Sequence, residues 1–310
     1  MNLLSFYKKY PTEKACILDL KNLKEKSGIV CKNCGCIKHK WKNTRNQWEC
    51  KRCGYRTSLK SGTVMHNSKL PLMYWYIARH LLTATKKSFS AAEIQRQLGH
   101  KRYQPIWELC HKLRDVMGQR DAEYQLKGSI EMDEGYFTVE RSESDKNKPL
   151  KRGRGSQSKS KVLVMIESEP TESTKHKIQK KAGYLKMIVI PDLKSDTITG
   201  EVINNIDCNA ELVTDDSTSY TKLHNHVKSH VSQVIPKKEV VKVLPWVHTA
   251  ISNAKRLLLN IHHFVRPEFL QNYLNEFCYK YNRRNIDLFE RLEYACLNYT
   301  PEFTHRTYRK

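Results

Sequence analysis

Three separated stretches of the sequence carry residue types that could hold a divalent cation and act on a phosphodiester. Asp133 lies in the stretch 128–137, which alternates apolar residues like a short strand and then becomes aromatic. Asp215 ends a second β-rich stretch, and the later stretch 244–263 is typical of a helix with polar groups on one face. Hard ions such as Mg²⁺ prefer oxygen ligands, and metal-assisted phosphoryl transfer places such ions at the reacting phosphate. Two strand-borne aspartates followed by this helix therefore indicate a metal-dependent phosphoryl-transfer enzyme that acts on a polyanion.

The charge of the chain indicates the class of partner. Its 310 residues include 55 Lys and Arg against 32 Asp and Glu, a formal net charge of +23. Such an excess favours nucleic acid as the partner. The sequence has no apolar run of about 18 residues, and its first residues form too short an apolar patch for a signal peptide. We therefore expect a cytoplasmic protein without a membrane partner.

Four cysteines near the N-terminus have the spacing of a structural zinc site. Two C-x-x-C pairs, Cys31 with Cys34 and Cys50 with Cys53, are separated by fifteen residues that leave room for a β-hairpin. Each pair directs two thiolates at one ion, and four thiolates complete a tetrahedral Zn²⁺ site. The alternative is two redox or disulfide pairs, which the absence of a secretory signal disfavours. We predict a zinc ribbon that folds with its metal, with Cys36 outside the site.

The next segment has the pattern of a helix-turn-helix. Ser90 and Glu93 form a capping-box pattern before a short helix, which Gly99 ends, and a further helix is predicted over 103–117. An ordinary helical hairpin would have the same pattern, and the basic context favours DNA binding. The residues predicted to face DNA are Lys101, Arg102, Lys112 and Arg114.

From residue 128 onward the order of predicted elements is typical of an α/β domain. Strands are predicted at 161–168, 184–193 and 211–217, and helices at 195–206, 247–262 and 268–283. Between the strand predicted at 128–137 and the strand predicted at 161–168 lies a loop rich in Gly, Ser and basic residues. Lys151, Arg152 and Arg154 of this loop are DNA-binding candidates, although a solvated charge run is the alternative.

The motifs EMDEGYF, KRGRGSQSK, LVTDDSTSY, LPWVHTAISNAKRLLLNIHH and YLNEFCYKYNRR resemble those of DDE-type transposases from prokaryotic insertion sequences. Within these, the chain is most similar to the group with an N-terminal zinc ribbon. The resemblance implies an α/β fold: a ribonuclease-H-like mixed sheet with flanking helices, preceded by the ribbon and the helix-turn-helix region. The domains expected are 1–60 (ribbon with an N-terminal helix), 61–124 (helix-turn-helix-like), 125–285 (catalytic) and 286–310 (a basic tail).

The resemblance also implies roles for individual residues. Asp133 and Asp215 match the two catalytic aspartates, which hold Mg²⁺ or Mn²⁺, and Lys255 matches a basic residue that contacts DNA near the scissile phosphate. The third acid of the family is missing. His248 stands seven residues before Lys255, and Asn253 matches members of the group in which Asn replaces the Glu. Helical periodicity favours His248, which shares a face with Lys255, whereas family habit favours Asn253; the sequence leaves both open.

The predicted function is that of an insertion-sequence transposase in a prokaryotic, nucleoid-associated setting. It would bind terminal inverted repeats in double-stranded DNA, cleave 3′ ends and join them to target DNA, acting as a homo-oligomer on DNA. Two alternatives remain open at this point: a DNA-binding protein with an inactive transposase-derived domain, and a nuclease on the ribonuclease-H fold.

Overall fold

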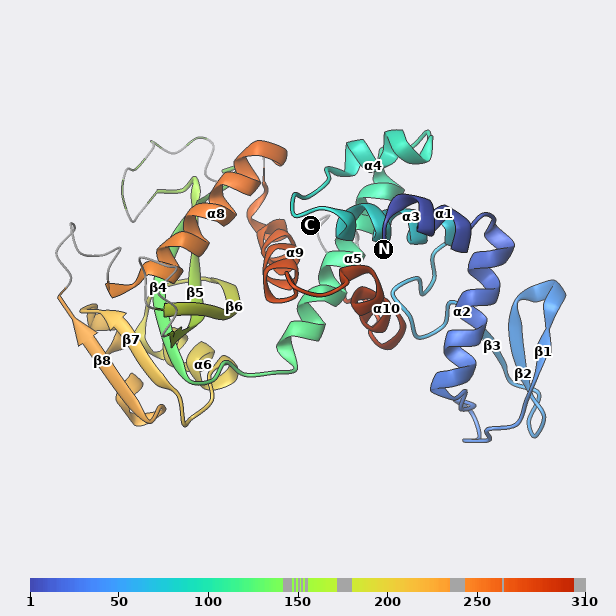
Figure 1. Cartoon of the computed structure of the whole chain (residues 1–310), viewed down its shortest axis with the longest axis horizontal. Helices are drawn as coiled ribbons and strands as arrows, with labels where there is room; N and C mark the ends of the chain where they lie inside the picture. The colour runs from blue at the N-terminus through green and yellow to red at the C-terminus, as the bar shows by residue number, and fades with distance from the viewer. Residues whose placement is uncertain are drawn as a thin grey trace. The chain divides into compact units, whose positions relative to one another are not determined.

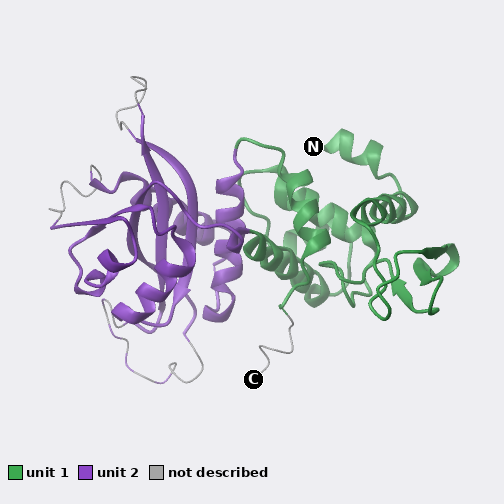
Figure 2. Cartoon of the chain, turned by 90° about the horizontal axis from the view of Figure 1, so that it is seen from below, with its two compact units in different colours: residues 1–120, 285–310 green, residues 121–284 purple. Residues whose placement is uncertain are grey.

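The computed structural model describes residues 1–141, 147, 149, 151, 153, 156–171, 180–234, 243–263 and 265–303. The chain divides into two compact units, residues 1–120 together with 285–310, and residues 121–284 (Figure 2).

The first unit begins with two helices and a small antiparallel sheet. Thr12 caps the second helix, because its side chain accepts a hydrogen bond from the Ala15 N–H. In the sheet, Trp41 and Trp48 stand opposite each other with ring centroids 4.7 Å apart. The buried Trp48 indole donates a hydrogen bond to Glu25 at 3.1 Å, which joins the sheet to the second helix. These elements are α1 (Leu3–Lys9), α2 (Glu13–Ser27), β1 (His39–Lys42), β2 (Gln47–Cys50) and β3 (Arg56–Ser58).

Four further helices form the rest of this unit. The side chain of Ser90 caps the N-terminus of α4, as the sequence predicts, and a turn containing Gly99 separates α4 from α5. Arg79 on α3 is buried and lies 3.2 Å from Glu293 and 3.9 Å from the ring centre of Phe289, both on α10. The helices are α3 (Leu72–Ala84), α4 (Ala91–Leu98), α5 (Tyr103–Ala122) and α10 (Leu288–Asn298).

The segment expected as a basic tail, residues 286–310, differs from that expectation. It contains α10, whose apolar side chains Phe289, Leu292 and Cys296 are buried. The side chain of Asp287 caps this helix by accepting the Phe289 N–H at 2.9 Å. The part up to residue 303 therefore belongs to the folded first unit, and residues 304–310 lie outside the described part.

The second unit is built on one five-stranded mixed sheet with the order β6-β5-β4-β7-β8. The strands β4, β5 and β6 pair antiparallel, whereas β7 and β8 run parallel to β4. The strand β8 was not predicted from the sequence; it is short and mostly exposed. The mixed sheet with flanking helices confirms the ribonuclease-H-like fold class. The strands are β4 (Ser129–Thr138), β5 (Lys159–Pro170), β6 (Lys180–Ile190), β7 (Glu211–Asp215) and β8 (Ser229–Gln233).

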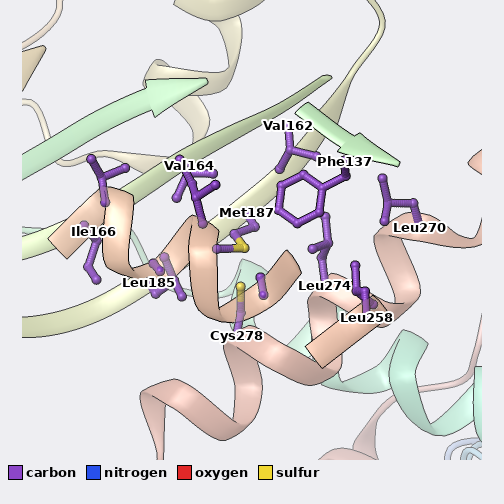
Figure 3. Close-up of a cluster of buried hydrophobic side chains, with 14 of the residues drawn as sticks. Phe137, Val162, Val164, Ile166, Leu185, Met187, Leu258, Leu270, Leu274 and Cys278 are labelled. Atoms are coloured by element: carbon purple, nitrogen blue, oxygen red, sulfur yellow. The ribbon is translucent and has the colours of Figure 1, made fainter. Parts of the chain in front are cut away.

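Helices cover both faces of this sheet (Figure 1). The helix α6 (Ser195–Asn205) packs on one face, and α8 (Pro245–Ile261) and α9 (Leu270–Asn282) pack on the other. Because side chains alternate along a strand, Ile130 and Met132 of β4 join the α6 core, whereas Phe137 joins the core under α8 and α9 (Figure 3). Burial on both faces fixes the register of β4, since a slip of one residue would exchange its two sets of side chains. Asp133 consequently belongs to the α8 face.

Candidate active site and candidate zinc site

The two predicted catalytic aspartates lie level with each other on neighbouring strands. The parallel pairing of β4 with β7 sets Glu131 opposite Val213, and two further residues along the same register bring Asp133 level with Asp215. Neighbouring strands are about 4.8 Å apart. Both aspartates are half-buried, and both lie on the face of the sheet that α8 covers. The fold thus brings together two carboxylates separated by more than eighty positions in the chain.

His248 lies over this pair from the first turns of α8. Its Nδ1 is 3.6 Å from Oδ2 of Asp133, and its side chain is 31% exposed. Burial lowers the pKa of His248 below its usual value of 6.5, although the carboxylates of Glu131 and Asp215 act in the opposite direction. The imidazole is therefore neutral near pH 7, and its contact with Asp133 is a polar contact rather than a salt bridge. A neutral imidazole retains the lone pair that a metal ligand needs.

Lys255 follows His248 after two turns of α8 and belongs to the same site. Its ammonium lies 5.6 Å from the centre of the Phe137 ring. Burial lowers the pKa of Lys255, and so does the neighbouring positive charge of Lys159, whereas Asp133 opposes the shift. Lys255 therefore places positive charge near Asp133, where a phosphate of DNA would be attracted.

Asn253, the other candidate for the third position, has a different environment. Its Oδ1 accepts a hydrogen bond from the guanidinium of Arg256 at 2.6 Å, on the exposed side of α8. It lies about 160° around the helix from Lys255. The structure thus groups His248 with Asp133 and Lys255, and it sets Asn253 on another side of the helix.

Further groups shape the surroundings of the acids. The backbone N–H of Glu134 donates to Oδ1 of Asp133 at 2.7 Å, which orients that carboxylate. Tyr220 is buried, and its pKa is raised by burial and by the negative charges of Glu134, Asp133 and Asp215. Asp216, the neighbour of Asp215, instead accepts a hydrogen bond from the Ser232 hydroxyl of β8 at 3.1 Å.

Asp133, Asp215 and His248 have side chains that can bind a divalent cation, and they would form an open site. Carboxylate oxygens and a neutral imidazole are ligands for Mg²⁺ or Mn²⁺, with imidazole favouring the softer ion. Among the described residues, the four N-terminal cysteines are the one group of three or more ligand side chains whose atoms all lie within 4.8 Å of one another. The acids and His248 are therefore spread more widely. Mg²⁺ usually keeps several waters and binds through one or two carboxylates and substrate phosphates, which fits such a site.

The four cysteines have the geometry of a closed tetrahedral site. The Sγ atoms of Cys31 and Cys53 are 3.6 Å apart, and so are those of Cys34 and Cys50. Four thiolates at the usual Zn–S distance of ≈ 2.3 Å lie about 3.8 Å apart. Hydrogen bonds from the backbone N–H groups of Cys53 and Arg52 and from neighbouring thiols lower the pKa of Cys50 to about 6, whereas the neighbouring thiols raise the pKa of Cys34. A metal would bind all four cysteines as thiolates. The cluster fits a zinc ribbon.

Each pair of cysteines lies on a tight turn that glycine permits. The N–H of Gly35 donates to the Cys31 carbonyl at 2.9 Å, and the N–H of Gly54 donates to the Cys50 carbonyl at 3.0 Å. Both glycines have positive φ, +69° and +72°, where other residues are strained. Cys36 lies outside the cluster, with its sulfur beside the backbone of Lys38.

Comparison with known proteins decides the family. Residues 125–282, which contain the whole acid site, match the family of ISXO2-like transposase domains. The chain belongs to this family. No curated protein matches the sequence. Two solved structures are similar over much of their length. The first, "Crystal structure of a pre-cleavage Mos1 transpososome", shares 9% sequence identity over 70% of this chain and 76% of that chain, with a TM-score of 0.27. The second, "Mos1 transposase paired-end complex with left transposon end", shares 10% sequence identity over 73% of this chain and 79% of that chain, with a TM-score of 0.23. Both likenesses are too weak to support a conclusion about this transposase.

The DNA-binding candidates of the transposase divide into exposed and buried residues. Lys101 and Arg102 are exposed in the turn between α4 and α5. Arg102 and Lys112 line an open groove of about 490 Å³ together with Lys69. Arg114 is wrong as a DNA-facing residue, because its side chain is fully buried and donates to the Phe89 carbonyl at 3.3 Å.

The basic loop lies largely beyond the described residues. Lys151 is exposed, and its backbone N–H donates to the side chain of Gln157 at 3.1 Å. Arg152 and Arg154 lie outside the described residues. None of the helices that the structure describes combines the length and the apolar character needed to span a bilayer.

One buried acid near the site, Glu131, was not predicted from the sequence. Glu131 is fully buried on β4 and accepts hydrogen bonds from the first turn of α8. A signal was available: Glu131 precedes Asp133 by two residues, so the strand pattern places both acids on one face.

Proposed function

We propose that this transposase binds the terminal inverted repeats of its own element, cleaves their 3′ ends and joins those ends to target DNA. The observation that supports the proposal is the placement of Asp133 level with Asp215 on neighbouring strands, with His248 at 3.6 Å and Lys255 on the same helix. Carboxylates gathered beside positive charge are what phosphoryl transfer to and from DNA requires.

In this proposal Asp133 and Asp215 hold Mg²⁺ or Mn²⁺, with His248 as the third ligand. When bound, the ions supply Lewis-acid activation of the attacking oxygen and stabilise charge on the transferred phosphoryl group. The Glu134 N–H keeps the Asp133 carboxylate oriented. The neutral state of His248 keeps its nitrogen available, and Lys255 binds the phosphate that is to be cut.

DNA binding in the proposal is carried by the first unit and by the basic residues around the acid site. The four cysteines hold Zn²⁺ and thereby stabilise the ribbon. Lys101, Arg102 and Lys112 contact DNA, as does Lys151 of the basic loop. We infer that two or more copies assemble on the DNA, because joining two ends of an element requires both ends to be held together.

One observation favours a second candidate. The third acid of the family is replaced by His248 or Asn253, so the chain could bind DNA without cutting it. A nuclease that cuts without joining is the third possibility.

One experiment separates the three. The purified protein is incubated with duplex oligonucleotides made from the inverted repeats that border its gene, a target plasmid, and Mg²⁺ or Mn²⁺. The proposal predicts new 3′-hydroxyl ends and covalent products in which those ends are joined to the plasmid. Cut ends without joined products would support the nuclease, and retarded but intact DNA would support the inactive binding protein.

A further inference from the structure

A buried carboxylate, Glu131, lies two residues before Asp133 on β4. Its side chain is fully buried on β4, on the same face as Asp133. Burying a carboxylate is costly unless hydrogen bonds compensate for the lost water. Here Oε2 accepts the backbone N–H groups of Trp246 at 2.8 Å and Val247 at 3.0 Å, and Oε1 accepts the Ser168 hydroxyl at 2.6 Å.

The two backbone donors belong to the first turn of α8, which has no cap of its own. The residue at the N-cap position is Leu244, whose apolar side chain makes no capping hydrogen bond, and Pro245 at the first helical position has no N–H. The next free donors are those of Trp246 and Val247, and both bind Glu131. A carboxylate at a helix N-terminus also interacts favourably with the helix dipole. Glu131 therefore replaces the missing N-cap from a strand more than a hundred residues earlier in the chain.

Residues of β5 and β6 also contact Glu131 or the first turn of α8. Lys180 at the start of β6 places its ammonium 4.0 Å from Glu131, and its carbonyl accepts the Trp246 indole N–H at 3.1 Å. Ser168 connects β5 to the same carboxylate. His248 follows Val247 directly, so the turn that Glu131 fixes is the turn that carries the His248 side chain towards Asp133.

We propose that Glu131 is a positioning residue: it holds the N-terminus of α8 on the sheet and so sets His248 and Lys255 relative to Asp133. Glu131 is fully buried, so we expect it to make no contact with DNA. Its effect on cleavage rests on the proposed function, whereas its effect on α8 does not.

The test compares matched substitutions of two buried carboxylates in the same sheet. Glu167 on β5 also accepts two backbone N–H groups, from Lys127 at 3.0 Å and Tyr184 at 2.8 Å, but neither belongs to α8. Glu131→Asp and Glu167→Asp each shorten a carboxylate by one methylene. Glu131→Gln keeps the length of the side chain. Its amide oxygen can accept the N–H groups of Trp246 and Val247, and its amide nitrogen can donate to the Ser168 hydroxyl.

Two measurements are made on the full chain with its zinc. The first is amide hydrogen exchange of the peptide that contains Trp246 and Val247, without DNA. The second is the single-turnover cleavage rate on the repeat-containing duplex, with the dissociation constant for that duplex measured alongside. Melting temperatures show whether each variant is folded.

The proposal predicts faster exchange at the start of α8 in Glu131→Asp but not in Glu167→Asp. Because a displacement of about 1 Å at a catalytic group can cost 10²-fold in rate, cleavage should slow about 100-fold in Glu131→Asp. The dissociation constant should stay within about twofold, because DNA affinity is carried by phosphate contacts that Glu131 does not make. Glu131→Gln should recover most of the rate, and Glu167→Asp should cleave like the unaltered protein while losing comparable thermal stability.

Two results would overturn the proposal. One is unchanged exchange at the start of α8 in Glu131→Asp; the other is equal cleavage by the two Asp variants although that exchange has risen. If the unaltered protein cuts no DNA, the proposed function fails instead, and the exchange measurement alone then decides whether Glu131 positions α8.

Discussion

Replacing His248 by Ala is the sharpest test of the third position in the active site. The imidazole Nδ1 is 3.6 Å from Oδ2 of Asp133, so its loss removes a ligand or polar group at the reacting centre. Losses of this kind cost about 10²–10³-fold in rate for groups that stabilise the transition state and about 10–100-fold for supporting groups. We expect a loss of about 100-fold, equivalent to about 2.7 kcal/mol of barrier. The side chain is 31% exposed, so the free energy of unfolding should change by only about 1 kcal/mol.

The assay is single-turnover cleavage of a labelled duplex at saturating protein, with Mg²⁺ and Mn²⁺ compared. The unaltered protein should work relatively better with Mn²⁺, because imidazole suits softer ions. His248→Glu supplies a carboxylate and should shift the preference towards Mg²⁺. Asn253→Ala, on the same helix, is the matched control: its Oδ1 bonds an exposed Arg256, so the rate should stay within about threefold. A hundredfold loss in Asn253→Ala with little loss in His248→Ala would refute the reasoning and assign the third position to Asn253.

Two further predictions concern the first unit. Cys31→Ser should lower the zinc content of the purified protein, measured by mass spectrometry of the metal, whereas Cys36→Ser should leave it unchanged because Cys36 lies outside the cluster; equal zinc in both variants would contradict the four-cysteine site. Burial, with the nearby charge of Arg79, lowers the pKa of His80 below 6.5 in the folded state. On acidification the unfolded state therefore binds the proton first. The free energy of unfolding should fall as pH drops from about 6.5 through the folded pKa. Urea unfolding at pH 7.5 and pH 5 should show a smaller decrease in His80→Gln, and an equal decrease would show that His80 does not contribute.

Local sequence pattern was sufficient to predict those features of the site that depend on residue spacing within a short stretch. The two C-x-x-C pairs predict a four-thiolate cluster, and the structure brings those sulfurs within 4.8 Å of one another. Short apolar, β-rich runs predict the strands that carry Asp133 and Asp215, because such runs are typical of strands buried in a sheet. The mixed sheet followed from the resemblance, since no local pattern specifies which strands pair.

Features that depend on distant contacts were beyond local pattern. Arg114 lies in a basic segment, yet the packing around Phe89 buries it, and charge alone cannot show which face of α5 points inward. The helix α10 was missed because its buried face is complementary to Arg79, which lies more than two hundred residues earlier. Strand alternation places Glu131 on the same face as Asp133, but residue types do not reveal its role, because its partners are backbone N–H groups of α8.

The most direct test of the central claim is Asp133→Asn, measured for cleavage and for binding on the same repeat-containing duplex. Asn keeps the size of the side chain and an oxygen that can accept the Glu134 N–H, so the fold should persist. Asp216→Asn is the matched control, because Asp216 lies just after the end of β7 and its carboxylate accepts a hydrogen bond from Ser232 of β8. Asp133→Asn should abolish cleavage and joining with nearly unchanged duplex affinity, while Asp216→Asn should remain active. Normal cleavage by Asp133→Asn would contradict the assignment of this site as the catalytic centre of a transposase.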